Sequence, residues 1–102
     1  MSVLKINQEN FQMLKNQKKS VLIDFYADWC GPCRMLSPVI DEIASENDDI
    51  IVAKVNVDES PELARDFAVY SIPSLFVIRN GEVVKRAQGA RRKSEILSML
   101  YG

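Results

Sequence analysis

The apolar residues of this chain fall into two patterns: short continuous runs, and residues spaced three to four apart. Continuous runs are typical of strands buried on both faces of a sheet, whereas the wider spacing is typical of amphipathic helices. The runs predict strands at residues 3–6, 21–26, 51–57, 74–79 and 82–87. The helical spacing predicts helices at 8–16, from about 30–32 to 46–49, at 58–67 and at 92–101.

Local signals add detail to these boundaries. Asn7 is a suitable N-cap for the first helix, and Pro61 suits the first turn of the third helix. Pro38 lies inside the second helix, where a missing N–H is expected to cause a kink. Asn80-Gly81 separates the last two predicted strands and predicts a tight hairpin.

The order of the predicted elements indicates the fold class. Strands separated by helices pair in parallel, and strands joined by a hairpin pair antiparallel. The chain therefore predicts an α/β fold, with a mixed five-stranded sheet and helices on both of its faces. At 102 residues, we expect residues 1–102 to form a single domain.

Composition narrows the function classes. The net charge is −1, which gives no electrostatic reason to expect nucleic acid or an anionic membrane as a partner. The chain contains no histidine, which excludes the usual imidazole-dependent hydrolases. No basic segment followed by a long apolar stretch opens the sequence, so we expect no secretory signal and a cytoplasmic protein.

Both cysteines lie in the segment Trp29-Cys30-Gly31-Pro32-Cys33, between the strand predicted at 21–26 and the following helix. One interpretation is a structural disulfide, but closing so short a loop stabilises the fold by only about 2 kcal/mol. A second is a metal site, which needs four Cys or His ligands that one chain does not supply, although two chains could share a metal. The third is a redox dithiol.

The redox interpretation gives the spacing a physical purpose. The first turn of a helix has free N–H groups and partial positive charge, which stabilise a thiolate at Cys30. Cys33 follows one turn later on the same side, within reach of the Cys30 sulfur. Cys30 can attack a partner's disulfide, and Cys33 can then resolve the mixed disulfide. Pro32 stiffens the turn and lacks an N–H that would be unpaired there.

Asp24 interrupts an apolar run that is otherwise typical of a buried strand. A carboxylate at a strand end that reaches water is one interpretation, but the apolar neighbours argue against it. A buried carboxyl near Cys33 would have a raised pKa and could accept the Cys33 proton. Lys54 alternates with apolar residues in the strand at 51–57, and if the two strands are neighbours it would lower the pKa of Asp24.

The sequence resembles the thioredoxin family over essentially all 102 residues. The matching stretches are Asp24-Phe25, Ala27, Trp29-Cys30-Gly31-Pro32-Cys33, Pro38, residues 53–58 (AKVNVD), Ile72-Pro73, Asn80-Gly81 and Gly89. The resemblance implies the thioredoxin fold, a central mixed sheet flanked by four helices. It also implies a monomeric thiol–disulfide oxidoreductase that reduces disulfide-containing protein substrates and is re-reduced by a thioredoxin reductase. The flavin and NADPH would be on that reductase, with no cofactor or metal bound here.

The resemblance also assigns roles to residues. Cys30 is implied as nucleophile, Cys33 as resolving thiol and Asp24 as proton acceptor, while Gly31 and Pro32 tune the redox potential toward a reductant. Lys54 is expected to tune the dithiol through Asp24. Pro73 corresponds to a cis-proline beside the dithiol. We expect a flat, mostly apolar surface that binds extended substrate backbone, made of Trp29, Gly31, Pro32, Ile72, Pro73, Gly89 and Ala90. Departures from the commonest family pattern, expected to affect partner choice or dithiol packing, are Tyr26, Tyr70 and Ser74.

Two other functions are compatible with a cysteine pair but are disfavoured by the residues around it. A glutathione-linked glutaredoxin is disfavoured by Trp29 and by Gly-Pro between the cysteines, and a binding module is disfavoured by the intact cysteine pair. The basic residues at 85–86 and 91–93 are expected to form a solvated face. Steering toward acidic partners is the alternative, and nucleic-acid binding is a weaker one because no aromatic residues interleave with the charges.

Overall fold

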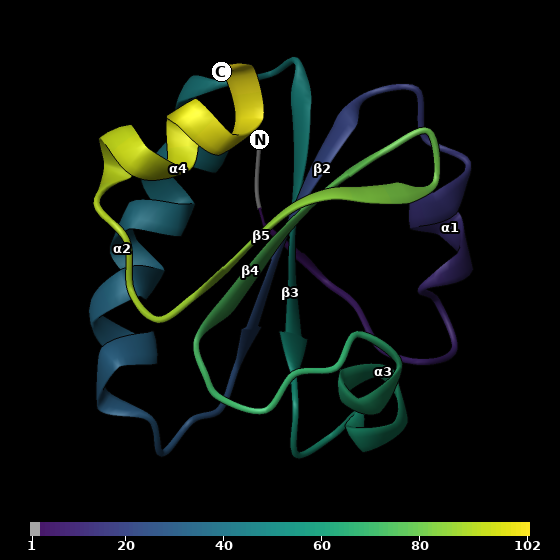
Figure 1. Cartoon of the computed structure of the whole chain (residues 1–102), viewed down its shortest axis with the longest axis vertical. Helices are drawn as coiled ribbons and strands as arrows, with labels where there is room; N and C mark the ends of the chain where they lie inside the picture. Colours follow the sequence, from purple (N-terminus) through teal and green to yellow (C-terminus); the bar gives the residue numbers. More distant parts are fainter. Residues whose placement is uncertain (1–2) are drawn as a thin grey trace.

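The computed structural model describes residues 3–102, and all nine predicted elements are present in it (Figure 1). In chain order they are β1 (Leu4–Lys5), α1 (Gln12–Lys15), β2 (Ser20–Tyr26), α2 (Gly31–Glu46), β3 (Ile50–Asn56), α3 (Pro61–Asp66), β4 (Ser74–Arg79), β5 (Glu82–Gln88) and α4 (Lys93–Tyr101). The strands form one sheet in the order β1-β3-β2-β4-β5.

The sheet is mixed, as predicted. Strand β3 pairs in parallel with both β1 and β2, and β4 pairs antiparallel with β2 and β5. Strand β4 therefore runs opposite to β2 and β3. The carboxyl ends of β2 and β3 and the start of β4 lie at the same end of the sheet (Figure 1). The candidate site lies at this end.

Helices cover both faces of the sheet. One hydrophobic cluster joins α1 and α3 to the sheet through Leu14, Leu63, Phe25 and Phe76. The other joins α2 and α4 to the opposite face, and its residues include Leu22, Leu36, Ile40, Ile43, Leu75, Val77, Ile96 and Leu100. Strand β2 is the central strand and is buried on both faces from Val21 to Phe25, which confirms the interpretation of its continuous apolar run.

The predicted start of the first helix is wrong. Asn7 Oδ1 accepts hydrogen bonds from the N–H groups of Glu9 and Asn10, at 2.9 and 3.0 Å, and so holds a turn in place of a helix cap. The helix itself begins at Gln12. A similar turn delays α3, because Asn56 Oδ1 accepts the N–H of Asp58 at 2.9 Å and the helix begins only at Pro61.

The hairpin and the proline were predicted correctly in position. Asn80 and Gly81 have φ of 54° and 79°, the left-handed conformations that a two-residue hairpin turn requires. A register shift between Val77 and Ile78 accompanies the pairing of β4 with β5. Pro38 lies inside α2 as expected, and the kink that it implies stays a prediction.

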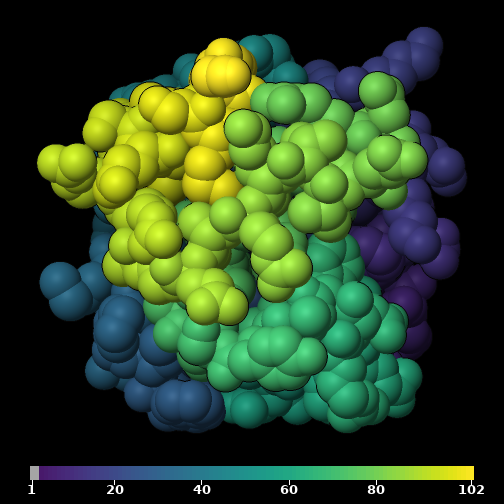
Figure 2. Space-filling model, viewed as in Figure 1, coloured from purple at the N-terminus to yellow at the C-terminus, as the bar shows by residue number. Residues whose placement is uncertain are grey.

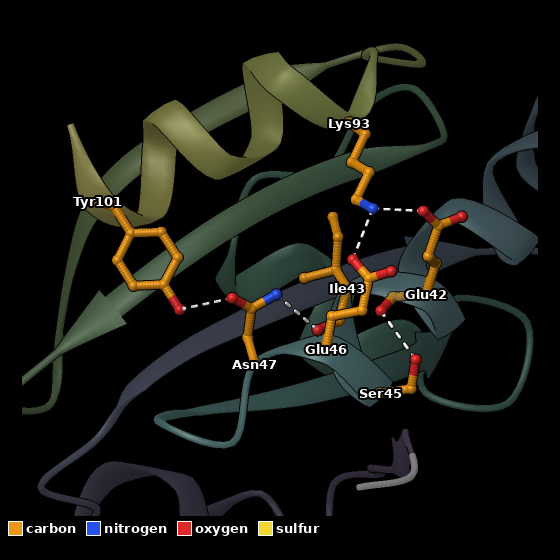
Figure 3. A network of polar contacts seen from close by, with 7 residues as sticks. All are labelled: Glu42, Ile43, Ser45, Glu46, Asn47, Lys93 and Tyr101. Atoms are coloured by element: carbon orange, nitrogen blue, oxygen red, sulfur yellow. Dashed lines mark hydrogen bonds and ion pairs between the residues drawn. The ribbon is translucent and has the colours of Figure 1, made fainter.

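Polar contacts attach α4 to the far end of α2 (Figure 3). The Lys93 ammonium donates to the carboxylates of Glu42 and Glu46, and the contact with Glu46 is 2.6 Å long. The Tyr101 hydroxyl lies 3.3 Å from Asn47 Oδ1 and also donates to Asp49. These contacts fix α4 on α2. The loop preceding α4 lies beside the first turns of α2, since Ala90 and Arg91 line a groove with Met35 and Leu36.

Candidate active site

The two cysteines lie where β2 ends and α2 begins. Cys30 is the N-cap of α2, and its Sγ accepts the backbone N–H of Cys33 at 3.2 Å. The two sulfurs form a disulfide, with the Cα atoms 5.2 Å apart. Because the capping atom is a sulfur at the positive end of a sixteen-residue helix, the same geometry would stabilise a thiolate when the disulfide is reduced.

The disulfide is largely covered by apolar neighbours. Cys30 is 5% exposed and Cys33 is 3% exposed, and they cluster with Ala27. Tyr26, Val57 and Ile72 pack against this cluster and are partly buried. Both cysteines are therefore buried, and little of either is open to a partner.

The segment at 71–74 supplies part of that backbone. The Ile72–Pro73 peptide bond is cis, as the family resemblance implied, and the carbonyl oxygen of Ile72 lies 4.0 Å from Cys30 Sγ. The Ser74 hydroxyl donates to the carbonyl of Ser71 at 2.6 Å, which closes the turn around the proline. Gly89 donates its N–H to the Pro73 carbonyl at 2.7 Å and so joins the same surface.

Trp29 stands on the other side of the cysteines. It is 68% exposed, and its Nε1 donates to Asp58 Oδ2 at 2.8 Å, which fixes the indole ring at the surface. Gly31 lies beside it, and a Cβ atom added there would meet nothing within 4 Å. Trp29 is thus exposed beside the cysteines, and its role as a substrate contact stays a prediction. Tyr70 is 88% exposed.

Asp24 is fully buried, and neither of its carboxylate oxygens has a hydrogen-bond partner among residues 3–102. Strand alternation puts it on the same face as Leu22, which packs against α2, the helix that carries Cys33. Burial raises the pKa of Asp24 to about 7, and the nearby Lys54 charge opposes that rise. The carboxyl is thus placed to change its protonation state near neutral pH.

Lys54 occupies the position in β3 that is in register with Asp24 in β2. Its ammonium donates to the Ser37 hydroxyl at 3.2 Å and lies 4.6 Å from the centre of the Tyr26 ring. Lys54, Ser37 and Tyr26 line a cavity of about 200 Å³ together with Cys33. The expected pairing with Asp24 is therefore one of neighbouring charges, because no hydrogen bond joins the two groups.

The sequence predictions missed two of these residues. Asp58 comes soon after β3, and Trp29 comes soon after β2, its parallel neighbour. Their contact at the carboxyl ends of the two strands could have been predicted from that pairing. Ser37 lies four residues after Cys33 on α2, which places both on one side of the helix. The first signal depends on knowing which strands are neighbours, whereas the second needs only the helical spacing.

Within residues 3–102 there is no cluster of three or more side chains suited to holding a metal ion. No helix in the same range is long and apolar enough to cross a membrane. The site that the structure presents is built from a disulfide, a buried carboxyl and a surrounding surface.

Comparison with known proteins yields consistent matches. A family model described as Thioredoxin matches residues 2–101. A thioredoxin of Mycobacterium tuberculosis is 45% identical over 101 residues, covering 97% of this chain and 87% of that protein. A bifunctional thioredoxin reductase/thioredoxin of Mycobacterium leprae is 48% identical over 88 residues, covering 85% of this chain and 19% of that protein. Among solved structures, a mutant thioredoxin from Halobacterium salinarum superposes with a TM-score of 0.91 at 35% identity, covering 97% and 88% of the two chains.

Proposed function

Because this chain belongs to the thioredoxin family and is a thiol–disulfide oxidoreductase, we propose that it reduces protein disulfides with Cys30 as nucleophile and Cys33 as resolving thiol. The observation that carries the proposal is the Cys30–Cys33 disulfide at the N-terminus of α2. Cys30 is the one of the two whose sulfur caps the helix and lies beside the Ile72 carbonyl.

The proposed reaction moves two electrons to the substrate. The Cys30 thiolate attacks one sulfur of the substrate disulfide, which forms a mixed disulfide and releases the other substrate sulfur as a thiolate. Cys33 then loses its proton and attacks Cys30 Sγ, which breaks the mixed disulfide and releases the second substrate sulfur. The chain is left with the Cys30–Cys33 disulfide, and each substrate thiolate takes a proton.

Asp24 is the proposed acceptor of the Cys33 proton, directly or through a water molecule. Its carboxyl lies on the sheet face that α2 covers, and burial holds its pKa near the pH at which such a transfer must work. Lys54 is the proposed tuning residue, since its ammonium is close enough to lower the pKa of Asp24 yet is bonded elsewhere.

The substrate is proposed to dock as an extended segment over the residues around Cys30. We name this area the docking surface, and it comprises Trp29, Gly31, Pro32, Ile72, Pro73, Gly89 and Ala90. The Ile72 backbone beside Cys30 Sγ is the proposed pairing partner of the substrate backbone. Gly31 and Pro32 between the cysteines are proposed to set a reductant's potential.

The proposed electron donor is a thioredoxin reductase that carries flavin and uses NADPH. The relative that combines a thioredoxin reductase with a thioredoxin in one chain supports this pairing. In this proposal the chain binds no cofactor of its own, acts as a monomer and works in the cytoplasm, where a dithiol reductant is kept reduced.

The test is catalysis of insulin-disulfide reduction with dithiothreitol as electron source. We expect the wild-type protein to accelerate the reaction and Cys30→Ser to lose that acceleration. Equal inactivity of the two proteins would favour a binding module. Reduction that requires glutathione would favour a glutaredoxin.

A further inference from the structure

We propose that Arg91 forms an anion-binding edge of the docking surface, so that the protein prefers target disulfides with acidic residues next to the cysteine. This inference rests on the proposed function, since it concerns the segment that approaches Cys30. The sequence alone favoured a solvated basic face made of residues 85–86 and 91–93, and the structure separates Arg91 from that face.

A continuous set of contacts connects Arg91 to the dithiol. The Ile72 carbonyl lies 4.0 Å from Cys30 Sγ. Pro73 follows Ile72, and its carbonyl accepts a hydrogen bond from the Gly89 N–H at 2.7 Å. A Cβ atom built on Gly89 would lie 3.6 Å from Nη1 of Arg91. The guanidinium therefore folds back against the docking surface instead of extending into solvent.

A groove runs from this point along α2. Its volume is about 290 Å³, and its lining residues are Met35, Leu36, Val39, Ala90, Arg91, Arg92 and Glu95. Met35 is 79% exposed at its rim. In Figure 2 the yellow-green loop between β5 and α4 meets the blue beginning of α2 at the edge of the molecule, which is where this groove lies. A segment leaving Cys30 on this side would therefore pass an apolar floor and the Arg91 guanidinium.

Arg91 is the available cation of the three at 91–93. Arg92 is paired with Glu95, with 3.3 Å between Nε and Oε1, and Lys93 is held by Glu42 and Glu46. Arg91 donates one N–H to the Ala90 carbonyl at 3.2 Å, and no carboxylate among residues 3–102 forms an ion pair with it. The Glu95 carboxylate, which lines the same groove and bonds to Arg92, is near enough for the Arg91 charge to help lower its pKa. A guanidinium has five N–H donors, so enough remain for two-point binding of a carboxylate.

On the other side of the dithiol, a carboxylate borders the docking surface. It belongs to Asp58, to which the Trp29 indole is bonded. A substrate with a carboxylate on the Gly89 side is attracted by Arg91, and one with an ammonium there is repelled. Surface charges of this kind act mainly on the association rate, and salt weakens their effect.

The test uses disulfide peptides in which one residue next to the target cysteine is Glu, Gln or Lys. One series varies the residue before the cysteine, and a second series varies the residue after it. We expect wild-type kcat/KM to be about three- to tenfold higher for Glu than for Gln on one flank at low salt. We expect the ratio to fall toward one in Arg91→Gln, and to be partly kept in Arg91→Lys.

The matched control is Lys18→Gln, which makes the same change in net charge before the start of β2, at the end of the strand opposite to Cys30. We expect it to keep the wild-type ratio. An unchanged ratio in Arg91→Gln, or equal reduction of the Glu and Gln peptides by the wild type on both flanks, would overturn the inference. If insulin is still reduced in that case, the proposed function stands. If insulin is not reduced by the wild type, both proposals fall together.

Discussion

Lys54 lies directly beside Asp24 in the adjoining parallel strand, yet its ammonium donates to Ser37, and the carboxylate has no hydrogen-bond partner in the part of the chain that the structure describes. Two opposing effects therefore act on the pKa of Asp24: burial raises it, and the Lys54 charge lowers it without a direct hydrogen bond. The charge of Lys54 still lowers the pKa of Asp24, but burial outweighs it, and the carboxyl titrates near pH 7.

The first prediction concerns stability. The unfolded chain ionises Asp24 at its ordinary pKa of 3.8, whereas the folded chain keeps the proton up to about pH 7. The free energy of unfolding therefore falls as the pH rises through this window, by up to about 4 kcal/mol, and levels off above it. Asp24→Asn should lack this fall, and so should exceed the wild type in stability at pH 8 and match it near pH 4. Denaturant unfolding across the pH range measures both curves.

The exposed Asp41 on α2 provides the control for this experiment. Asp41→Asn should keep the wild-type dependence on pH. Parallel curves for the wild type and Asp24→Asn would show that Asp24 is ionised in the folded protein at low pH, contrary to the burial argument.

The second prediction concerns resolution of the mixed disulfide. Without the Asp24 carboxylate, the Cys33 proton has no buried acceptor, so Asp24→Asn should slow this step by about tenfold or more at pH 7. The wild-type rate should rise with pH around 7, and the variant should lose that inflection. Rapid quenching followed by mass spectrometry measures the decay of the mixed disulfide.

Cys33→Ser supplies the reference for that measurement, because it should form the mixed disulfide and keep it. A rate for Asp24→Asn that equals the wild type across pH 6–8 would remove Asp24 from the mechanism. Preserved attack by Cys30 in all three proteins would show that the first step is intact.

The third prediction concerns Lys54. Since its charge lowers the pKa of Asp24, Lys54→Gln should move the pH midpoint of the resolution rate above the wild-type value near 7. Lys18→Gln, remote from the site, should leave the midpoint where it is. A midpoint that moves to lower pH in Lys54→Gln would contradict the direction of the Coulomb effect.

The fourth prediction compares two glycines. Gly89 has φ of 84°, where a side chain is strained, and its N–H is bonded to Pro73. Gly89→Ala should therefore destabilise the fold by about 1 kcal/mol and weaken substrate reduction. Gly31→Ala places its Cβ in open space at the start of α2 and should not destabilise the fold. Unfolding curves of the two variants give the comparison, and equal stability would contradict it.

Most of the fold could be predicted from the sequence because periodicity reports burial. The unbroken apolar run at 21–26 became the central strand, and the helical spacing in α2 and α4 became the faces that contact the sheet. The error at the first helix has a local cause. Asn7 can cap either a helix or a tight turn, and its neighbours Glu9 and Asn10 complete the turn.

Part of the site could be predicted because its reactive residues lie close together in the sequence. Trp29, Cys30 and Cys33 are adjacent in sequence, and Asp24 is conspicuous as a carboxylate among apolar residues. The partners of Trp29 and Lys54 come from segments 29 and 17 residues away, so they depend on the arrangement of the sheet. The balance between burial and charge at Asp24 also requires the geometry, because the two effects have opposite signs.

The two edge strands of the sheet are built in a way that resists aggregation at high protein concentration. Edge strand β1 has only two residues, and edge strand β5 is highly exposed, charged at Glu82, Lys85 and Arg86, and paired through an irregular register. Short, charged or bulged edges resist the addition of foreign strands, which is a common route to aggregation. The protein can thus offer backbone to a partner beside Cys30 while its own sheet stays closed to unwanted growth.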